Sequence, residues 1–112
     1  MWRWILASYK DGYKPLKRFQ HTANFFNNFL IVLGGRNGSH NINLPIEIYD
    51  TMTGKWVSFS YFNAFRHTAW IVDNIIYIYG GFKSKLAQNI QSDVIKINLI
   101  QFFNSNEFKK KK

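Results

Sequence analysis

Apolar and polar positions alternate along the chain over short stretches, which is typical of β-strands rather than of helices. An apolar run, Phe29–Leu33, follows Phe25 and Phe26 after a gap of two asparagines, Asn27 and Asn28. Asparagine tolerates the left-handed backbone that a two-residue hairpin turn requires. The pattern therefore predicts a β-hairpin with its turn at these two asparagines.

Two further strands are predicted after this hairpin. Residues 46–49 alternate apolar and polar side chains, residues 50–54 have the composition of a turn, and residues 55–59 place their large side chains on one face. The polar loop at residues 36–45 joins them to the hairpin. We therefore expect four antiparallel strands in one unit.

The same pattern occurs a second time. Residues 19–35 match residues 65–81 at an offset of 46 positions without a gap, and seven of the 17 pairs are identical. Chance at average composition gives about one identity. Asp73 and Asn74 stand where the first copy has its two asparagines, so a second hairpin turn is predicted there. Residues 94–98 fit the third strand after a two-residue insertion, and no tryptophan follows to mark a fourth.

The order of marker residues in the first copy resembles a full Kelch repeat, and the second copy follows the same order only as far as its Gly-Gly pair. The markers are a histidine before the hairpin, a Gly-Gly pair after it, a Tyr-Asp pair after the third strand and a tryptophan in the fourth. They are His21, Gly34, Gly35, Tyr49, Asp50 and Trp56 in the first copy, and His67, Gly80 and Gly81 in the second. The resemblance implies an all-β chain of two four-stranded antiparallel Kelch blades from an incomplete β-propeller, with the markers in structural roles.

The resemblance also divides the chain. Residues 1–14 are expected to be the end of a preceding repeat or a linker, and Trp2 and Trp4 would belong to its fourth strand. Residues 15–60 form the first repeat, residues 61–106 the second, with its outer strand left open, and residues 107–112 a basic tail. A closed Kelch propeller has about six blades. We therefore expect the chain to be a fragment of a longer protein or, as the alternative, to assemble with further blades or with copies of itself.

Within Kelch proteins, residues 18–21, 65–69 and 76–81 most resemble the propeller of the plant and protozoan Ser/Thr phosphatases with Kelch-like repeats. The metal-binding motifs of the phosphatase half of that family are missing from this sequence. The resemblance therefore implies no phosphatase activity here.

Composition and charge narrow the function classes. The chain has no cysteine, which excludes disulfides, thiolate metal sites and cysteine nucleophiles. Its longest apolar runs are about five residues, whereas a membrane span needs about twenty. We expect a soluble cytoplasmic protein, with the nucleus as the alternative. The net charge of +9 indicates anionic partners.

The sequence contains no convincing catalytic or cofactor site. His21 and His67 occupy equivalent positions, but a metal site needs three or four ligands and no further candidates accompany either histidine. His40 stands alone in a loop. The Gly-Gly segment at residue 34 lacks the alternating glycines of a dinucleotide loop. We therefore expect no enzyme activity, no metal and no cofactor.

Binding remains as the expected function. In Kelch propellers that bind peptides, the loops after the second strand and the entrance to the first commonly contribute to one face. The resemblance implies partner-binding roles for the residues at these positions, which are Gln20, Arg36, Asn37, Arg66, Phe82 and Lys83. Arginine suits carboxylate or phosphate recognition, because its planar fork donates paired hydrogen bonds. An acidic protein or peptide is the expected partner.

A basic nucleic-acid-binding protein is the alternative reading. Its support is the basic cluster at the start of the chain together with the terminal lysine run, and the cluster consists of Lys10, Lys14, Lys17 and Arg18. Most aromatic residues, however, lie at strand positions that the core of a blade explains. The aromatic sheet motif of RNA-binding domains is also missing.

Overall fold

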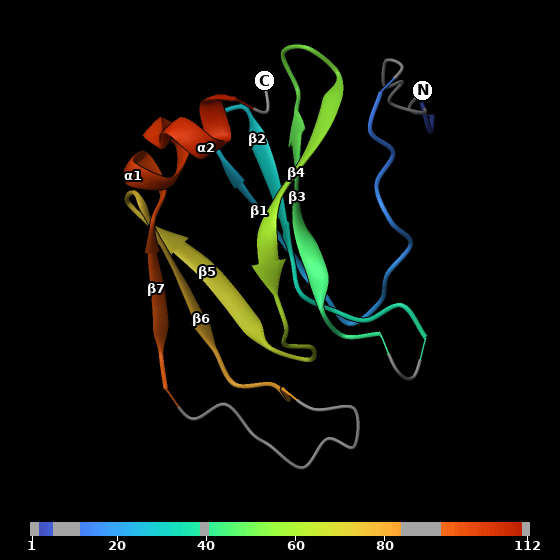
Figure 1. The fold of residues 1–112 in the computed structure, drawn as a ribbon, viewed down its shortest axis with the longest axis vertical. Coiled ribbons are helices and arrows are strands. Elements are labelled where there is room, and N and C mark those ends of the chain that lie inside the picture. The colour runs from blue at the N-terminus through green and yellow to red at the C-terminus, as the bar shows by residue number, and fades with distance from the viewer. Residues whose placement is uncertain (1–2, 6–11, 39–40, 84–92, 111–112) are drawn as a thin grey trace.

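The protein forms two antiparallel β-sheets and two short helices in the computed structural model, which describes residues 3–5, 12–38, 41–83 and 93–110. The strands follow one another in chain order within each sheet (Figure 1). Sheet 1 contains β1 (Thr22–Phe26), β2 (Phe29–Leu33), β3 (Leu44–Asp50) and β4 (Lys55–Phe62). Sheet 2 contains β5 (Thr68–Val72), β6 (Ile75–Tyr79) and β7 (Ile95–Asn98), and α1 (Leu99–Asn104) and α2 (Asn106–Lys109) follow it.

Both predicted hairpins are confirmed. Phe26 pairs with Phe29 across the first turn, and Val72 pairs with Ile75 across the second. The first turn residue has a positive φ in each case, 54° at Asn27 and 55° at Asp73. Asn and Asp adopt this left-handed conformation more readily than most other residues. The two hairpins are therefore built in the same way.

The third and fourth strands of sheet 1 are also confirmed, and both are longer than predicted. Their turn closes through hydrogen bonds that Gly54 N donates to Asp50 O at 2.8 Å and Met52 N donates to Asp50 Oδ1 at 2.9 Å. Trp56 pairs with Tyr49 across these strands, and their ring centroids lie 5.1 Å apart. The two rings are therefore in contact, and Trp56 is half-buried.

The mostly β architecture agrees with the predicted all-β fold, but the expected second four-stranded blade, whose outer strand was left open, is not seen among the described residues. Sheet 2 has three strands among the described residues, and α1 begins directly after β7. Leu99, Phe102 and Phe103 recur at helical spacing, which places their side chains on one helix face. Asn98 Oδ1 caps α1 by accepting a hydrogen bond from Gln101 N at 3.1 Å. The chain is thus mostly β, with a helical segment where a fourth strand was expected.

The core lies between the two sheets and is closed by the helices (Figure 1). Its fully buried members are hydrophobic residues from both sheets and both helices: Ile31, Leu33, Ile46, Ile48, Ile76, Ile78, Leu99 and Phe108. Phe103 stacks on Phe29 with ring centroids 4.3 Å apart, and Phe108 packs edge-on against Phe103 at 4.9 Å. Phe108, which the sequence analysis assigns to a basic tail, therefore belongs to the core.

Residues 12–18 cover part of the opposite face of sheet 1, which we call its outer face. Glu47 points to this face and is 1% exposed. It accepts hydrogen bonds from Leu16 N at 2.9 Å and from Arg18 Nη2 at 2.6 Å. Trp4 is exposed, no strand is present among the described residues before β1, and Trp2 lies outside them. The expected strand of a preceding repeat is therefore not seen in the described part of the chain.

Candidate functional site

The open ends of the two hairpins, opposite their turns, lie next to each other in the lower half of Figure 1. Past its Gly-Gly pair, each hairpin is extended by a short backbone bridge. Phe19 and Arg36 exchange hydrogen bonds at 3.0 and 2.9 Å, and Phe65 and Phe82 exchange the equivalent bonds at 3.1 and 2.9 Å. These bridges hold the predicted binding residues next to the segments that lead into β1 and β5.

Arg36 occupies the junction between the two units. Its guanidinium carbon lies 5.1 Å from the ring centre of Phe19 and 4.7 Å from that of Phe65. Its Nε donates a hydrogen bond to Gln20 Oε1 at 2.8 Å. Among the described residues, no acceptor bonds its two terminal amino groups. The rings and the amide thus hold the guanidinium plane in place, while its outer edge can still donate a pair of hydrogen bonds.

Gln20 and Arg66 share an unusual backbone conformation. Their φ angles are 60° and 58°, which is the left-handed region that few residues other than Gly, Asn and Asp adopt. The Arg66 N–H donates to Gln20 O at 3.0 Å and links the two units. Strained residues of this kind are concentrated at binding and switch sites. The strain occurs at the two equivalent positions that the sequence singles out.

The remaining predicted residues lie next to this pair. Asn37 Nδ2 donates to Lys17 O at 2.7 Å, which fastens the first loop to the segment before β1. Phe82 packs against Phe65 with ring centroids 5.7 Å apart, and the exposed Lys83 follows it. We call this surface the basic mouth, and its residues are Lys17, Gln20, Arg36, Asn37, Arg66, Phe82 and Lys83.

The charge of the basic mouth is strongly one-sided. Four of its seven residues are Lys or Arg, and none is acidic. Asp50 and Asp73 lie at the other end of the strands, whereas Asp93 lies just before β7, at the end of sheet 2 where β6 leads into its Gly-Gly pair. Several cations on one loop cluster attract an anionic ligand and orient it during encounter.

His67 joins the two sheets. Its ring is 7% exposed, and its Nε2 lies 2.8 Å from the hydroxyl oxygen of Thr22 in β1. The ring also packs edge-on against Phe62 at 5.5 Å. Burial, followed by the nearby His21, lowers the pKa of His67 to about 4. His67 therefore links the second unit to β1 of the first unit through Thr22.

His21 lies at the equivalent position but has no such junction. Its side chain is exposed. Partial burial, followed by the charge of Arg18, lowers its pKa. The other predicted markers, the Gly-Gly pairs, end β2 and β6 as expected. The loop residue His40 lies outside the described residues.

Sequence reasoning missed the buried ion pair between Arg18 and Glu47. Both side chains are almost fully buried, and the Tyr13 hydroxyl also donates to Glu47 Oε2. The sequence did contain a sign of this pair, because Glu47 is a carboxylate between two isoleucines of a predicted strand. A carboxylate buried in such a strand needs a buried partner. Arg18 belongs to the basic cluster that supports the nucleic-acid alternative, and its burial removes it from that surface. Lys10 of the same cluster lies outside the described residues.

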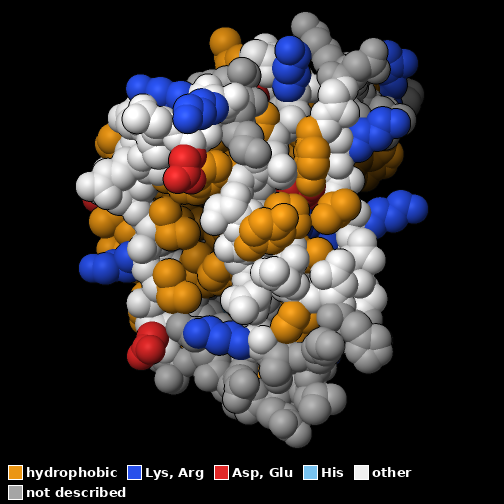
Figure 2. All heavy atoms as spheres, viewed as in Figure 1, with side chains coloured by type: hydrophobic (Ala, Val, Ile, Leu, Met, Phe, Trp, Pro, Cys, Tyr) orange, Lys and Arg blue, Asp and Glu red, His pale blue; other side chains and the backbone are white. Residues whose placement is uncertain are grey.

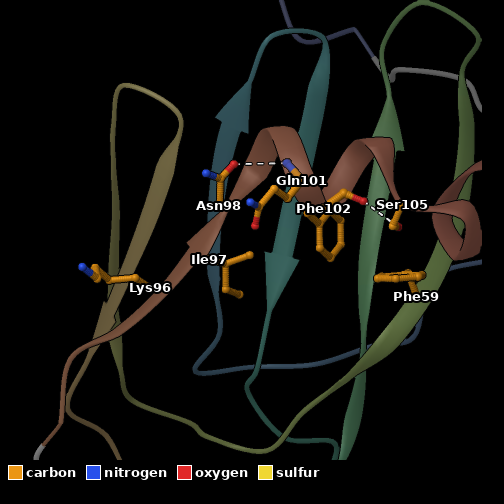
Figure 3. A pocket seen from close by; sticks show the side chains of 7 residues that line it. All are labelled: Phe59, Lys96, Ile97, Asn98, Gln101, Phe102 and Ser105. Carbon is orange, nitrogen blue, oxygen red and sulfur yellow. Dashed lines mark hydrogen bonds between the residues drawn. The ribbon is translucent and has the colours of Figure 1, made fainter.

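An open hollow lies between β4 and β7, where the two sheets diverge (Figure 3). Phe59, Ile97 and Phe102 give it an apolar floor. Asn98, Gln101 and Ser105 are among its polar residues, and the dashed lines in Figure 3 show Asn98 and Ser105 capping or closing helical turns. None of the predicted site residues lines this hollow.

Two general features of the described residues complete the description. No group of three His, Asp or Glu side chains in them could together hold a metal ion. No helix formed by these residues is both long and apolar enough to cross a membrane.

Comparison with known proteins gives no family for this chain. A scan against protein-family models finds no match, and a search of curated proteins finds no similar sequence.

Proposed function

We propose that this chain is a protein-interaction module, a pair of Kelch-like blades from an incomplete β-propeller, which binds an acidic partner protein or peptide at the basic mouth. In a larger protein, it would act as the regulatory, partner-binding part. The order of the marker residues supports the blade assignment. The arrangement of the sheets supports it too, because their first strands, β1 and β5, lie side by side while their last strands lie apart. Asn24 Nδ2 donates to Ala69 O at 3.3 Å between β1 and β5, whereas the outermost strands border the open hollow.

Arg36 is the single observation that supports binding most strongly. Its guanidinium is held between two rings and by Gln20, so little side-chain entropy remains to be lost when a ligand binds. The outer edge of the guanidinium matches the two oxygens of a carboxylate. Arg66 and Lys83, both exposed, supply further charge for neighbouring acidic residues of a peptide.

Fluorescence polarisation with a labelled peptide rich in Glu and Asp tests this function. Arg36→Ala should weaken binding by about tenfold or more, because a hydrogen bond to a charged group contributes about 1.5–3 kcal/mol. Arg36→Lys should recover only part of the affinity, because the ammonium keeps the charge but lacks the fork. Lys55→Ala is the matched control, since Lys55 is an exposed cation at the turn end of β4.

Two results would overturn the proposal. One is equal affinity of the unchanged chain for the acidic peptide and for a neutral peptide of the same length. The other is an Arg36→Ala variant that binds as tightly as the Lys55→Ala control. A labelled oligonucleotide of generic sequence serves as the rival probe: tight, steeply salt-dependent binding that Arg36→Ala leaves unchanged would favour the nucleic-acid alternative.

A further inference from the structure

The outward face of sheet 2 is an exposed apolar surface, which we call the open face. It contains the side chains that point away from the core on β5 and β6, together with Val94 just before β7. Its residues are Trp70, Val72, Ile75, Tyr77, Tyr79 and Val94. Trp70 and Tyr77 stack with ring centroids 5.8 Å apart, and no hydrophobic element covers them among the described residues. Hydrophobic side chains also reach the surface over the region of sheet 2 in Figure 2.

The internal repeat relates each residue of the open face to an equivalent residue of sheet 1, 46 positions earlier. Leu33 is 1% exposed in the core, whereas its equivalent Tyr79, 46 positions later, is 48% exposed. Phe26 packs against the core, whereas its equivalent Val72 is 50% exposed. The open face is therefore the counterpart of the face of sheet 1 that packs against sheet 2.

Two glycines show the same difference at the level of single atoms. A Cβ added to Gly34 would come within 2.3 Å of Ala64 O and 2.5 Å of His67 Cε1, because the next unit packs directly on this glycine. A Cβ added to the equivalent Gly80 would meet nothing within 4 Å. Gly80 thus has the same left-handed backbone as Gly34, with φ at +78°, but no neighbouring unit packs on it among the described residues.

The complementary half of this junction lies on the opposite side of the chain. His67 covers Gly34, whereas its equivalent His21 is exposed on the outer face of sheet 1. That outer face also carries Phe25, which is exposed, and the half-buried Leu30. Their equivalents, Ile71 and Ile76, face sheet 1 in the core. One chain therefore presents both halves of the same contact on its two opposite sides.

We propose that a second copy of this chain docks head to tail on the open face and repeats the internal junction between the two sheets. His21 of the second copy covers Gly80 and lies beside the hydroxyl of Thr68, as His67 covers Gly34 and lies beside Thr22. Phe25 and Leu30 of the second copy pack against Val72, Tyr77 and Tyr79. The contact joins two different surfaces, so it closes into a ring or continues as an open string of copies.

Variants with only one altered surface test this proposal by sedimentation velocity. Tyr79→Lys alters the open face, and Phe25→Lys alters the outer face of sheet 1; both positions are exposed within one chain. The unchanged chain should form species larger than 13.3 kDa in a concentration-dependent manner, and each variant alone should be a monomer. An equal mixture should form dimers and nothing larger, because each variant keeps the surface that the other lacks. Ile100→Lys, on the exposed side of α1, should associate like the unchanged chain.

Three outcomes would overturn head-to-tail docking. They are an unchanged chain that is monomeric at all concentrations, variants that associate as the unchanged chain does, and a mixture of folded variants that remains monomeric. Val72→Lys provides a second change on the open face in case Tyr79→Lys loses its far-ultraviolet β signal. These outcomes are independent of peptide binding, because Arg36 is unchanged in every variant.

Discussion

Glu47 is the residue that most clearly connects the N-terminal segment to sheet 1. Its carboxylate accepts hydrogen bonds from Tyr13, Leu16 and Arg18, and the Arg18 guanidinium also donates to Gly34 O and Pro45 O, both at 2.8 Å. Arg18 and Glu47 are 3% and 1% exposed, so water cannot solvate either charge if its partner is lost. The pair is therefore a point at which a single substitution has a large cost.

We expect Glu47→Gln to lower the free energy of unfolding by about 3–5 kcal/mol, because it leaves the buried Arg18 charge without a counter-ion. Urea unfolding followed by circular dichroism measures this change. The double variant Arg18→Met, Glu47→Leu is the control and should be less destabilised than the single variant, since it leaves no unpaired charge. A cost below about 1 kcal/mol for Glu47→Gln would mean that the pair is solvated in solution.

His67 makes the stability of the junction depend on pH. Its pKa is lowered to about 4 by burial and, to a smaller extent, by His21, whereas the unfolded chain has the ordinary value of 6.5. Between these values the unfolded state binds more protons than the folded state, so stability falls as pH falls. His67→Gln should flatten this dependence.

Urea midpoints measured between pH 7.5 and pH 4.5 test this expectation. His21→Gln, at the more exposed histidine, is the comparison and should flatten the dependence less than His67→Gln. The contribution of His67 is present above about pH 6.5 and decreases toward pH 4, with an upper limit of about 3 kcal/mol. Identical pH profiles for His67→Gln and the unchanged chain would contradict the buried, neutral histidine.

The Kelch resemblance selected the proposed binding positions but did not predict the contacts between them. Sequence equivalence placed Gln20 with Arg66 and located Arg36 directly after a Gly-Gly pair, and the structure brings these positions to one surface. The rings around Arg36 and the partner of Glu47 could not be predicted. Phe65 and Arg18 are both far from their partners in sequence. The packing of one unit on the next brings Phe65 to Arg36, and the packing of residues 12–18 on sheet 1 brings Arg18 to Glu47.

At the scale of secondary structure, turn chemistry and alternation were sufficient for the strands. Asn27, Asp73 and Gly54 identified three turns, and the predicted strands beside these turns are present, although β3 and β4 are longer than predicted. The segment after β7 is helical although a strand was expected there. The expectation rested on the Kelch resemblance, whereas the apolar residues of this segment have helical spacing. Leu99, Phe102 and Phe103 recur every three or four residues, and Asn98 and Ser105 are helix-capping residues. Local periodicity was the better guide there.

The helices should contribute to stability through Phe108, which closes the space between the sheets. Phe108→Ala should lower the free energy of unfolding by about 3–5 kcal/mol, because it removes a fully buried aromatic side chain. Ile100→Ala, at a half-exposed position of α1, should cost less than about 1 kcal/mol and is the matched control. Urea unfolding of both variants provides the comparison, and equal costs would show that α2 does not pack on the core in solution.

At the scale of the whole molecule, the chain is an array of two similar units with one mutual interface. In a longer or closed array each unit has a neighbour on both sides, whereas the described residues provide no sheet-sized partner for the open face or for the outer face of sheet 1. Small domains are stable by only about 5–15 kcal/mol, so the loss of such interfaces is large on that scale. Exposed apolar surfaces of this kind promote association, which the net charge of +9 opposes only in part.

Light scattering combined with thermal melting of the unchanged 112-residue chain, at low micromolar concentration, tests this two-unit account most directly. We predict that the chain is not a monodisperse monomer and that its scattering mass and melting temperature both rise with concentration, because association stabilises the folded state. A sharp, cooperative and concentration-independent melt from a monodisperse 13.3 kDa monomer would contradict the account. It would show that two units with both outward faces open form a complete, stable fold.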